Sequence, residues 1–202
     1  VTITEPDALD GSITAQTNVL CNGDANGSVT VAGADGTPGY LYSTNGGATT
    51  QASGTFSGLS AGALTVTVVD ANGCIFDVPV TIAEPDALGG SITAQTNVLC
   101  NGDATGSVTV AADVGTGTPG YLYSLDGGAT TQASGTFNGL SAGALTVTVV
   151  DANGCIFPVP VTITEPDALG GSVTAQTNVL CNGGATGSVT VAGSDGTPGY
   201  LY

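Results

Sequence analysis

The sequence predicts an all-β chain built from tandem antiparallel β-sandwich repeats of about 80 residues. Three observations lead to this fold class. Apolar and polar residues alternate over short runs, which is the pattern of half-buried strands. Turns that contain Gly separate the runs, and no segment has the periodicity of a helix. The sequence also contains an internal repeat, because the motif that begins at Val1 begins again at Val80 and at Val161, after 79 and then 81 residues.

The period sets the expected domain organisation. We expect residues 1–4 to be the last strand of a preceding repeat, 5–83 to form repeat 1, 84–164 to form repeat 2, and 165–202 to be part of repeat 3. The sequence starts inside a strand motif and stops in mid-repeat, so we expect a longer array. A unit of this size buries a thin core and usually needs a crosslink or a neighbour.

Within repeat 1 the alternation predicts seven strands, over 12–20, 28–33, 40–44, 48–52, 54–57, 63–70 and 74–82. Asn72-Gly73, between the last two, indicates a two-residue hairpin turn. Pro79 has no N–H to donate, which places the last strand at a sheet edge. Short strands with regular turns are typical of an immunoglobulin-like sandwich. The expected core comprises Val29, Val31, Leu41, Phe56, Leu59, Leu64, Val66, Val68, Phe76, Val78, Val80 and Ile82.

The charged side chains are all acidic, which excludes several function classes. The chain has 16 acidic residues and no Lys, Arg or His. Phosphate contacts need cations, so we expect no nucleic-acid binding. No apolar run is long enough to span a membrane, so we expect no membrane insertion. Cys and Ser lack a neighbouring base, so we expect no catalytic residues, no enzyme activity and no cofactor.

Acidic and amide side chains gather in the turns and in the segments between repeats. The expected joints between repeats are Glu5, Pro6, Asp7, Glu84, Pro85, Asp86, Glu165, Pro166 and Asp167. Calcium needs six to eight oxygen ligands, and the weak candidates for it are Asp24, Asp70, Glu84, Asp86 and Asp151. Asp and Asn are also common turn residues, and we expect that role rather than metal binding.

The repeat carries the motifs TITEPDAL, NVLCNGDANGSVTV, GTPGY, GGATT, GLSAGALTVTVVDANGC and the strand that follows the last of these. Together these motifs resemble the SprB repeat of gliding-motility adhesins from Bacteroidetes. The resemblance covers nearly the whole chain. It implies very large surface proteins of the type IX secretion pathway, built from many copies and used to grip surfaces.

The five cysteines occupy two positions in the repeat, and their pairing is open to three schemes. Bonds within a repeat give Cys21–Cys74 and Cys100–Cys155, with Cys181 pairing beyond the sequence. Bonds across a joint give Cys74–Cys100 and Cys155–Cys181. Stacked sandwiches allow Cys21–Cys155. We favour the first scheme, and small cysteine-paired units indicate an extracellular setting.

These observations lead to a functional hypothesis. We expect a disulfide-stabilised stalk of a large secreted cell-surface adhesin or extracellular filament, used in surface attachment or gliding. Its partners would be neighbouring repeats of the same chain, and lateral assembly of identical chains into a filament is left open. The alternative is a carbohydrate-binding module repeated for avidity, with Tyr40, Tyr42, Tyr121 and Tyr123 as a sugar-stacking platform and a polysaccharide as ligand. For each tyrosine pair, we expect instead that one ring packs in the core.

Overall fold

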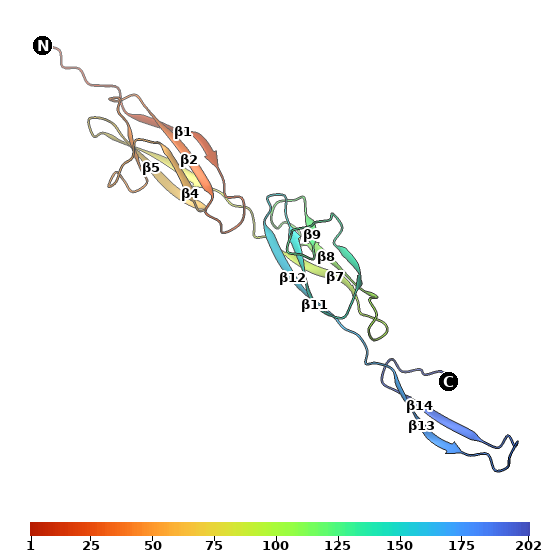
Figure 1. Ribbon diagram of the computed structural model, residues 1–202. Coiled ribbons are helices and arrows are strands. Elements are labelled where there is room, and N and C mark those ends of the chain that lie inside the picture. Colours follow the sequence, from red (N-terminus) through yellow and green to blue (C-terminus); the bar gives the residue numbers. More distant parts are fainter. The chain divides into compact units, whose positions relative to one another are not determined.

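A computed structural model describes residues 1–202 and contains fourteen β-strands and no helix. Figure 1 shows how the strands follow one another along the chain. By its contacts the chain divides into two compact units. Unit 1 comprises Val1–Leu88, Val114–Gly120 and Asp151–Cys155. Unit 2 comprises Gly89–Asp113, Tyr121–Val150 and Ile156–Tyr202. The division assigns two loops of repeat 2, residues 114–120 and 151–155, to unit 1.

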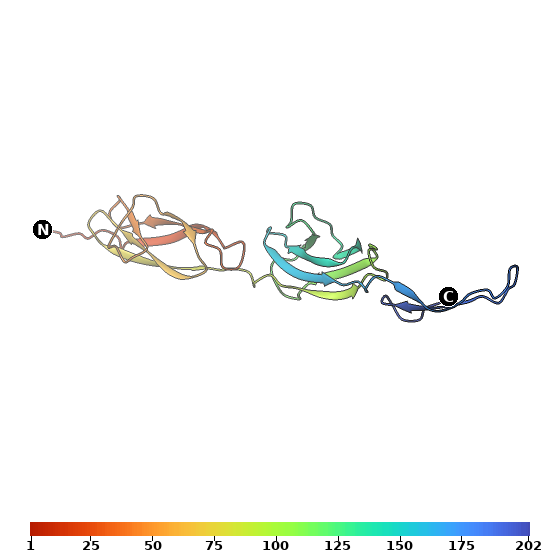
Figure 2. The ribbon, with the colours of Figure 1, turned by 60° about the horizontal axis from the view of Figure 1, so that its bottom comes forward.

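Unit 1 is a sandwich of two three-stranded antiparallel sheets. One sheet has the order β1-β2-β4 and the other β3-β5-β6. Figure 2 shows the strands of unit 1, coloured red to yellow, from another side. The strands are β1 (Asp10–Thr17), β2 (Gly27–Ala34), β3 (Leu41–Ser43), β4 (Thr55–Leu59), β5 (Gly62–Val69) and β6 (Ile75–Ile82). The predicted fold class is therefore confirmed. Strand β6, which carries Pro79, lies at the edge of its sheet, as the missing N–H predicts.

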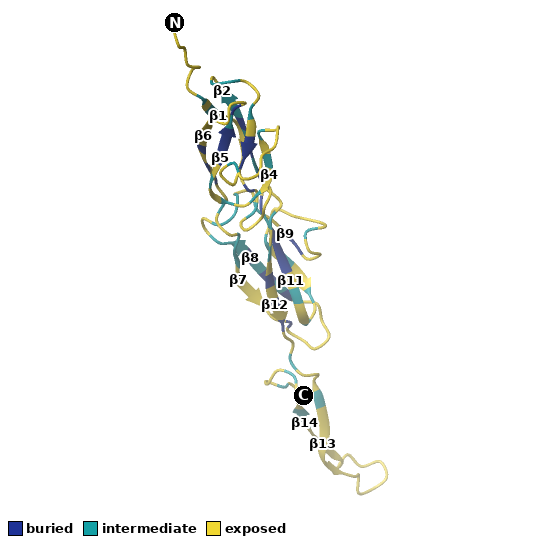
Figure 3. Ribbon diagram, turned by 90° about the vertical axis from the view of Figure 1, so that its left-hand side faces the viewer, coloured by how far each residue is buried: buried dark blue, intermediate teal, exposed yellow.

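The core of unit 1 lies between the two sheets and consists mainly of valines. Val29 and Val31 of β2 pack in one cluster with side chains of β5 and β6. Figure 3 shows the buried residues along β5. The prediction of Leu41 as a core residue is wrong, because successive strand residues face opposite ways and Tyr42 takes the inward position. Tyr42 brings its hydroxyl inside, where it accepts a hydrogen bond from the Gly33 N–H at 3.0 Å.

The predicted strand over 48–52 is also wrong, because this segment makes only an isolated bridge between Tyr42 and Gln51. Side-chain hydrogen bonds hold the preceding residues in a loop instead. The Ser43 hydroxyl accepts from the N–H groups of Asn45 and Gly47, and Asn45 Oδ1 accepts from the Thr49 N–H. Such local bonds compete with sheet pairing. The repeat consequently has six strands rather than seven.

Unit 2 repeats the same architecture and adds a terminal hairpin. Its sheets have the orders β10-β8-β7 and β12-β11-β9, and β13 pairs with β14. Strand β13 is almost wholly exposed (Figure 3). The strands are β7 (Gly90–Thr96), β8 (Gly106–Ala112), β9 (Leu122–Ser124), β10 (Thr136–Leu140), β11 (Gly143–Val150), β12 (Ile156–Ile163), β13 (Gly170–Thr177) and β14 (Ser188–Ser194).

One loop of unit 2 carries a carboxylate where unit 1 has the amide of Asn45. Asp126 accepts hydrogen bonds from the hydroxyls of Ser124 and Thr130 and from the Thr130 N–H. These bonds favour the charged form and lower the pKa of Asp126 to about 2.

The turn between β5 and β6 is longer than the predicted two-residue hairpin. The Asp70 N–H donates to the Cys74 carbonyl at 3.0 Å, so three residues lie inside the turn. Gly73 there has φ of 84°, in the left-handed region that glycine enters without steric cost. The Asp70 carboxylate accepts from the N–H groups of Asn72, Cys74 and Thr37. Burial raises the pKa of Asp70, but these hydrogen bonds outweigh it and the net shift is downward.

Candidate functional site

The candidate site begins where the first and last strands of repeat 1 are held together. Gln16 Nε2 donates to the Thr81 carbonyl at 2.8 Å, and the Val19 N–H donates to the Ala83 carbonyl at 2.9 Å. Asn18 Oδ1 accepts from the Ala83 N–H at 3.1 Å. These bonds hold the end of β1 beside the end of β6. Residues 20–24, which follow β1, therefore lie next to the segment that follows β6.

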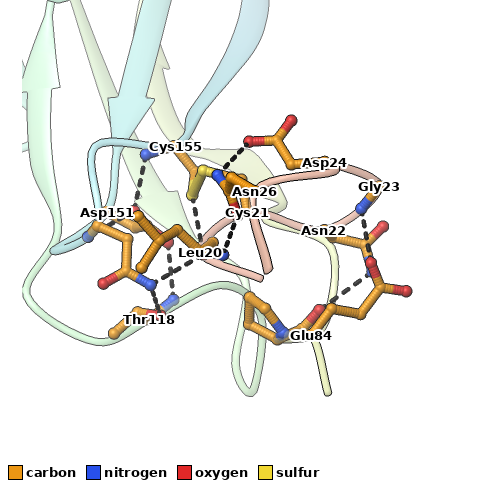
Figure 4. Close-up of a disulfide and its surroundings, with 12 residues drawn as sticks. Leu20, Cys21, Asn22, Gly23, Asp24, Asn26, Glu84, Thr118, Asp151 and Cys155 are labelled. Atoms are coloured by element: carbon orange, nitrogen blue, oxygen red, sulfur yellow. Dashed lines mark hydrogen bonds between the residues drawn. A yellow bond between two sulfur atoms is a disulfide. The ribbon is translucent and has the colours of Figure 1, made fainter. Parts of the chain in front are cut away.

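Residues 20–24, which we call the receiving turn, are bound to the predicted joint Glu84–Asp86. The Gly23 N–H donates to Glu84 Oε2 at 2.7 Å, and Asn22 Nδ2 donates to the Pro85 carbonyl at 3.0 Å (Figure 4). The chain has no basic side chain, so the Glu84 carboxylate takes a backbone N–H as its partner. A bond of this kind to a charged acceptor is stronger than one between neutral groups. The joint is therefore anchored at its start.

The end of the joint is held by a loop of repeat 2 that belongs to unit 1. The Gly117 N–H donates to the Asp86 carbonyl at 3.0 Å. The same bond recurs one repeat earlier, where the Gly36 N–H donates to the Asp7 carbonyl at 3.1 Å. The joint is thus bound by turns on both of its sides.

Residues 151–155, which join β11 to β12, form a turn with the same bonds as residues 70–74. We call both segments hairpin turns. Asp151 Oδ1 accepts from the N–H groups of Asn153 and Cys155 at 2.9 Å each, and Asp151 Oδ2 accepts from the Thr118 N–H at 2.8 Å. Asn153 Nδ2 donates to the Thr118 hydroxyl and also to the Leu20 carbonyl, both at 2.9 Å. The hairpin turn of repeat 2 is therefore seated between Thr118 and the receiving turn.

A disulfide joins Cys21 of the receiving turn to Cys155 of this hairpin turn, with their Cα atoms 5.6 Å apart (Figure 4). The bond closes a loop with a sequence separation of 134 residues. Cys74, Cys100 and Cys181 are free and exposed. Within the described chain, the disulfide and the hydrogen bonds around it are the most developed site, and its chemistry is crosslinking.

The predicted pairing within repeats is wrong. Cys21 lies beside the end of β6 and Cys74 directly precedes the start of that strand. Eight strand residues span roughly 26 Å at the usual rise, whereas bonded cysteines need Cα atoms within about 7 Å. The same strand length separates the two positions in repeat 2, which excludes Cys100–Cys155. The pairing of Cys74 with Cys100 and of Cys155 with Cys181 does not occur either.

The calcium candidates are not brought together. Asp24 accepts from Asn26 Nδ2, Glu84 binds the Gly23 N–H, and the carboxylates of Asp70 and Asp151 are used inside their own hairpin turns. No group of three or more Cys, Asp or Glu side chains in the chain has a geometry that could hold a metal ion. Asp86 contributes its backbone carbonyl to the joint.

The structure places one tyrosine of each predicted pair in the core. Tyr42 and Tyr123 are buried, and Tyr40 donates its hydroxyl to the Asp35 carbonyl at 2.6 Å. One ring of each pair therefore packs in the core, as expected. Sequence reasoning missed Asn22 and Asn153 as residues of the site. Their recurrence at the same place in every full repeat was the signal that could have identified them.

The start of the third expected joint is bound as the start of the second is. The Gly102 N–H donates to Glu165 Oε2 at 2.7 Å, and Asn101 Nδ2 donates to the Pro166 carbonyl at 3.1 Å. At the first joint, Glu5 and Pro6 are exposed and precede the first strand. The structure contains no helix of the length and apolarity that crossing a bilayer requires.

Comparison with known proteins identifies the repeat. The chain is similar to fibronectin(III)-like modules of CbhA from Clostridium thermocellum, with 16% identity, a TM-score of 0.35, and coverage of 76% of this chain and 93% of that one. No curated protein matches the chain. The family model described as the SprB repeat matches three times, at residues 13–49, 92–130 and 173–202, which together make up just over half of the sequence. The chain therefore belongs to the SprB repeat family.

Proposed function

We propose that this chain is a load-bearing stalk segment of a large secreted cell-surface adhesin, and that it acts in surface attachment or gliding. The role is structural rather than enzymatic. The single observation that supports it most is the disulfide between Cys21 and Cys155, which links a strand end of repeat 1 to a turn of repeat 2. A stalk must transmit tension from repeat to repeat, and a covalent bond in addition to the main chain suits that task.

The route of the tension supports the same proposal. A pull on the N-terminal end reaches Cys21 before any other cysteine, and a pull on the C-terminal end reaches Cys155 after Cys181 alone. The covalent route through the disulfide bypasses residues 22–154, so five of the six strands of repeat 1 are relieved of the load. Hydrogen-bonded sheets in that segment then need not resist unfolding for the stalk to hold.

The chain's charge is consistent with an exposed stalk. Sixteen acidic residues without any cation keep such a surface soluble and repel other copies. Backbone N–H groups, rather than basic side chains, satisfy the Glu84 carboxylate of the joint and the Asp151 carboxylate of the hairpin turn. The bond to Asp151 is partly buried, so salt screens it less than it screens surface ion pairs. The hairpin turn of repeat 2 therefore suits an external medium of varying ionic strength.

The experiment compares attachment with and without shear. Whole repeats are deleted from the parent protein in its own cells, and attachment to a surface is measured at rest and under flow. A stalk predicts normal attachment at rest and a loss under flow. In parallel, the purified 202-residue chain is tested against a polysaccharide panel. Saturable binding to one polysaccharide, with a loss of attachment at rest, would overturn the stalk and favour the repeated carbohydrate-binding module.

A further inference from the structure

Unit 2 contains a second receiving turn, residues 99–103, built in the same way as the first. The Asp103 N–H donates to the Cys100 carbonyl at 3.1 Å, which equals the distance from the Asp24 N–H to the Cys21 carbonyl. The Leu99 N–H donates to the Thr105 hydroxyl at 3.1 Å, where Leu20 uses Asn26. The bonds to Glu165 and Pro166 described above complete the match. Cys100 is nevertheless exposed and free.

A hollow lies beside this second receiving turn at the position that the hairpin turn fills in unit 1. The hollow measures about 500 Å³, and its lining includes Leu99, Cys100 and Thr197. Leu99 and Thr197 occupy the sequence positions of Leu20 and Thr118. In unit 1 the Asn153 side chain donates to both Leu20 and Thr118.

The hairpin turn does not need the disulfide in order to form. The turn at 70–74 has a free cysteine, yet Asp70 Oδ1 accepts from the N–H groups of Asn72 and Cys74 at 2.9 and 2.8 Å. Asn72 Nδ2 donates to the Thr37 hydroxyl at 2.7 Å, as Asn153 does to Thr118. Both halves of the crosslink are thus preorganised before they meet, which lowers the entropic cost of pairing.

We propose that Cys100 is a crosslinking site whose partner is the hairpin-turn cysteine of a following repeat with the sequence Asp-Ala-Asn-Gly-Cys. Cys74 is the complementary half, and it pairs with a receiving turn of a preceding repeat. Each repeat then forms two disulfides, one to the repeat before it and one to the repeat after it. The inference concerns connectivity and stands whether the array serves as a stalk or as a binding module.

The bond forms by two thiol–disulfide exchanges with a disulfide oxidant, for which glutathione disulfide is the probe. The Cys100 thiolate attacks one sulfur of the oxidant, forms a mixed disulfide and releases one glutathione thiolate. The hairpin-turn thiolate attacks the Cys100 sulfur of that mixed disulfide, forms the protein bond and releases the second glutathione. The two cysteines lose two protons and two electrons, and the oxidant is reduced to two thiols.

The proposed bond of Cys100 starts inside the existing disulfide loop and ends outside it. Cys100 lies inside the loop that Cys21 and Cys155 close, and its partner lies beyond Cys155. Successive loops therefore overlap along the chain. With overlapping loops, no single main-chain break inside the array separates it into two pieces.

The test extends the full chain by a copy of residues 124–164 placed after Tyr202, which corresponds to Tyr123 and so completes repeat 3. The extended protein is folded in a glutathione redox buffer, its free thiols are alkylated, and it is cut without reduction at the N-terminal side of aspartates. This cleavage releases every cysteine on a separate peptide. We expect Cys100 bonded to the added cysteine, Cys21 bonded to Cys155, and alkylated Cys74 and Cys181.

Two controls make the result decisive. Replacing the added cysteine by serine should restore alkylation of Cys100, whereas Cys181→Ser should leave both bonds unchanged. Alkylated Cys100 in the extended protein, or Cys100 bonded to Cys74 or Cys181, would overturn the proposal. Absence of the Cys21–Cys155 bond from the extended protein would overturn it too, because the pairing rule is drawn from that bond.

Discussion

Mechanical extension of the 202-residue chain should depend strongly on its disulfide. The chain is pulled between handles at Val1 and Tyr202 in an optical trap, first oxidised and then as the Cys155→Ser variant. In the oxidised chain, tension bypasses the 134-residue separation between Cys21 and Cys155. Extended backbone spans about 3.4 Å per residue, so the oxidised chain should be shorter at full extension by about 450 Å.

Matched variants and a reductant assign this length difference to the disulfide itself. Cys74→Ser and Cys181→Ser remove free cysteines and should leave the full extension unchanged. Addition of a reductant to the oxidised chain should restore the missing length in a single step. Equal full extensions for the oxidised chain and the Cys155→Ser variant would refute the bypass and the load-bearing role built on it.

Three further variants test the crosslink, the hairpin turn of repeat 2 and the loop that contains Asp126. Val114→Lys introduces a unique trypsin site into a chain without Lys or Arg. After cleavage, the protein should run on a denaturing gel as one species without reductant and as two species with reductant. Two species in the absence of reductant would contradict the crosslink. Asp151→Ala removes a carboxylate that accepts hydrogen bonds from three N–H groups. It should lower the free energy of unfolding of unit 1 by about 1–3 kcal/mol in urea and should slow formation of the Cys21–Cys155 disulfide. Asp70→Ala is the matched control, and it should leave the rate at which that disulfide forms unchanged. In the folded chain the pKa of Asp126 is lowered from 3.8 to about 2, so the contribution of this carboxylate to stability is present above pH 3.8 and is lost as the pH falls toward 2. Asp126→Asn introduces the amide that repeat 1 has at Asn45, and it should reduce the fall of the thermal midpoint between pH 4 and about 2. An unchanged fall of the thermal midpoint over this pH range would contradict this role for Asp126.

The strands and most of the core could be predicted from the sequence because alternation is a local signal. Val66, Val68 and Val80 are buried as the alternation predicts. The errors occur where side chains compete with the pattern. Hydrogen bonds of Ser43 and Asn45 replace the predicted strand over 48–52, and the three-residue interior of the turn at 70–74 depends on Asp70, which a dipeptide signal does not represent.

The disulfide could not be predicted from cysteine spacing, because spacing does not show which strand ends are neighbours in space. Strand length, however, excludes one of the possible pairings. Cys21 lies beside the end of β6 and Cys74 precedes the start of that strand, so any repeat with this order of elements keeps its own two cysteines a strand length apart. A bond within the repeat is excluded by that geometry. A cysteine that forms a disulfide must then find its partner outside its own repeat, and the strand that separates the two cysteines of a repeat is the reason that the Cys21–Cys155 bond joins repeats rather than closing one.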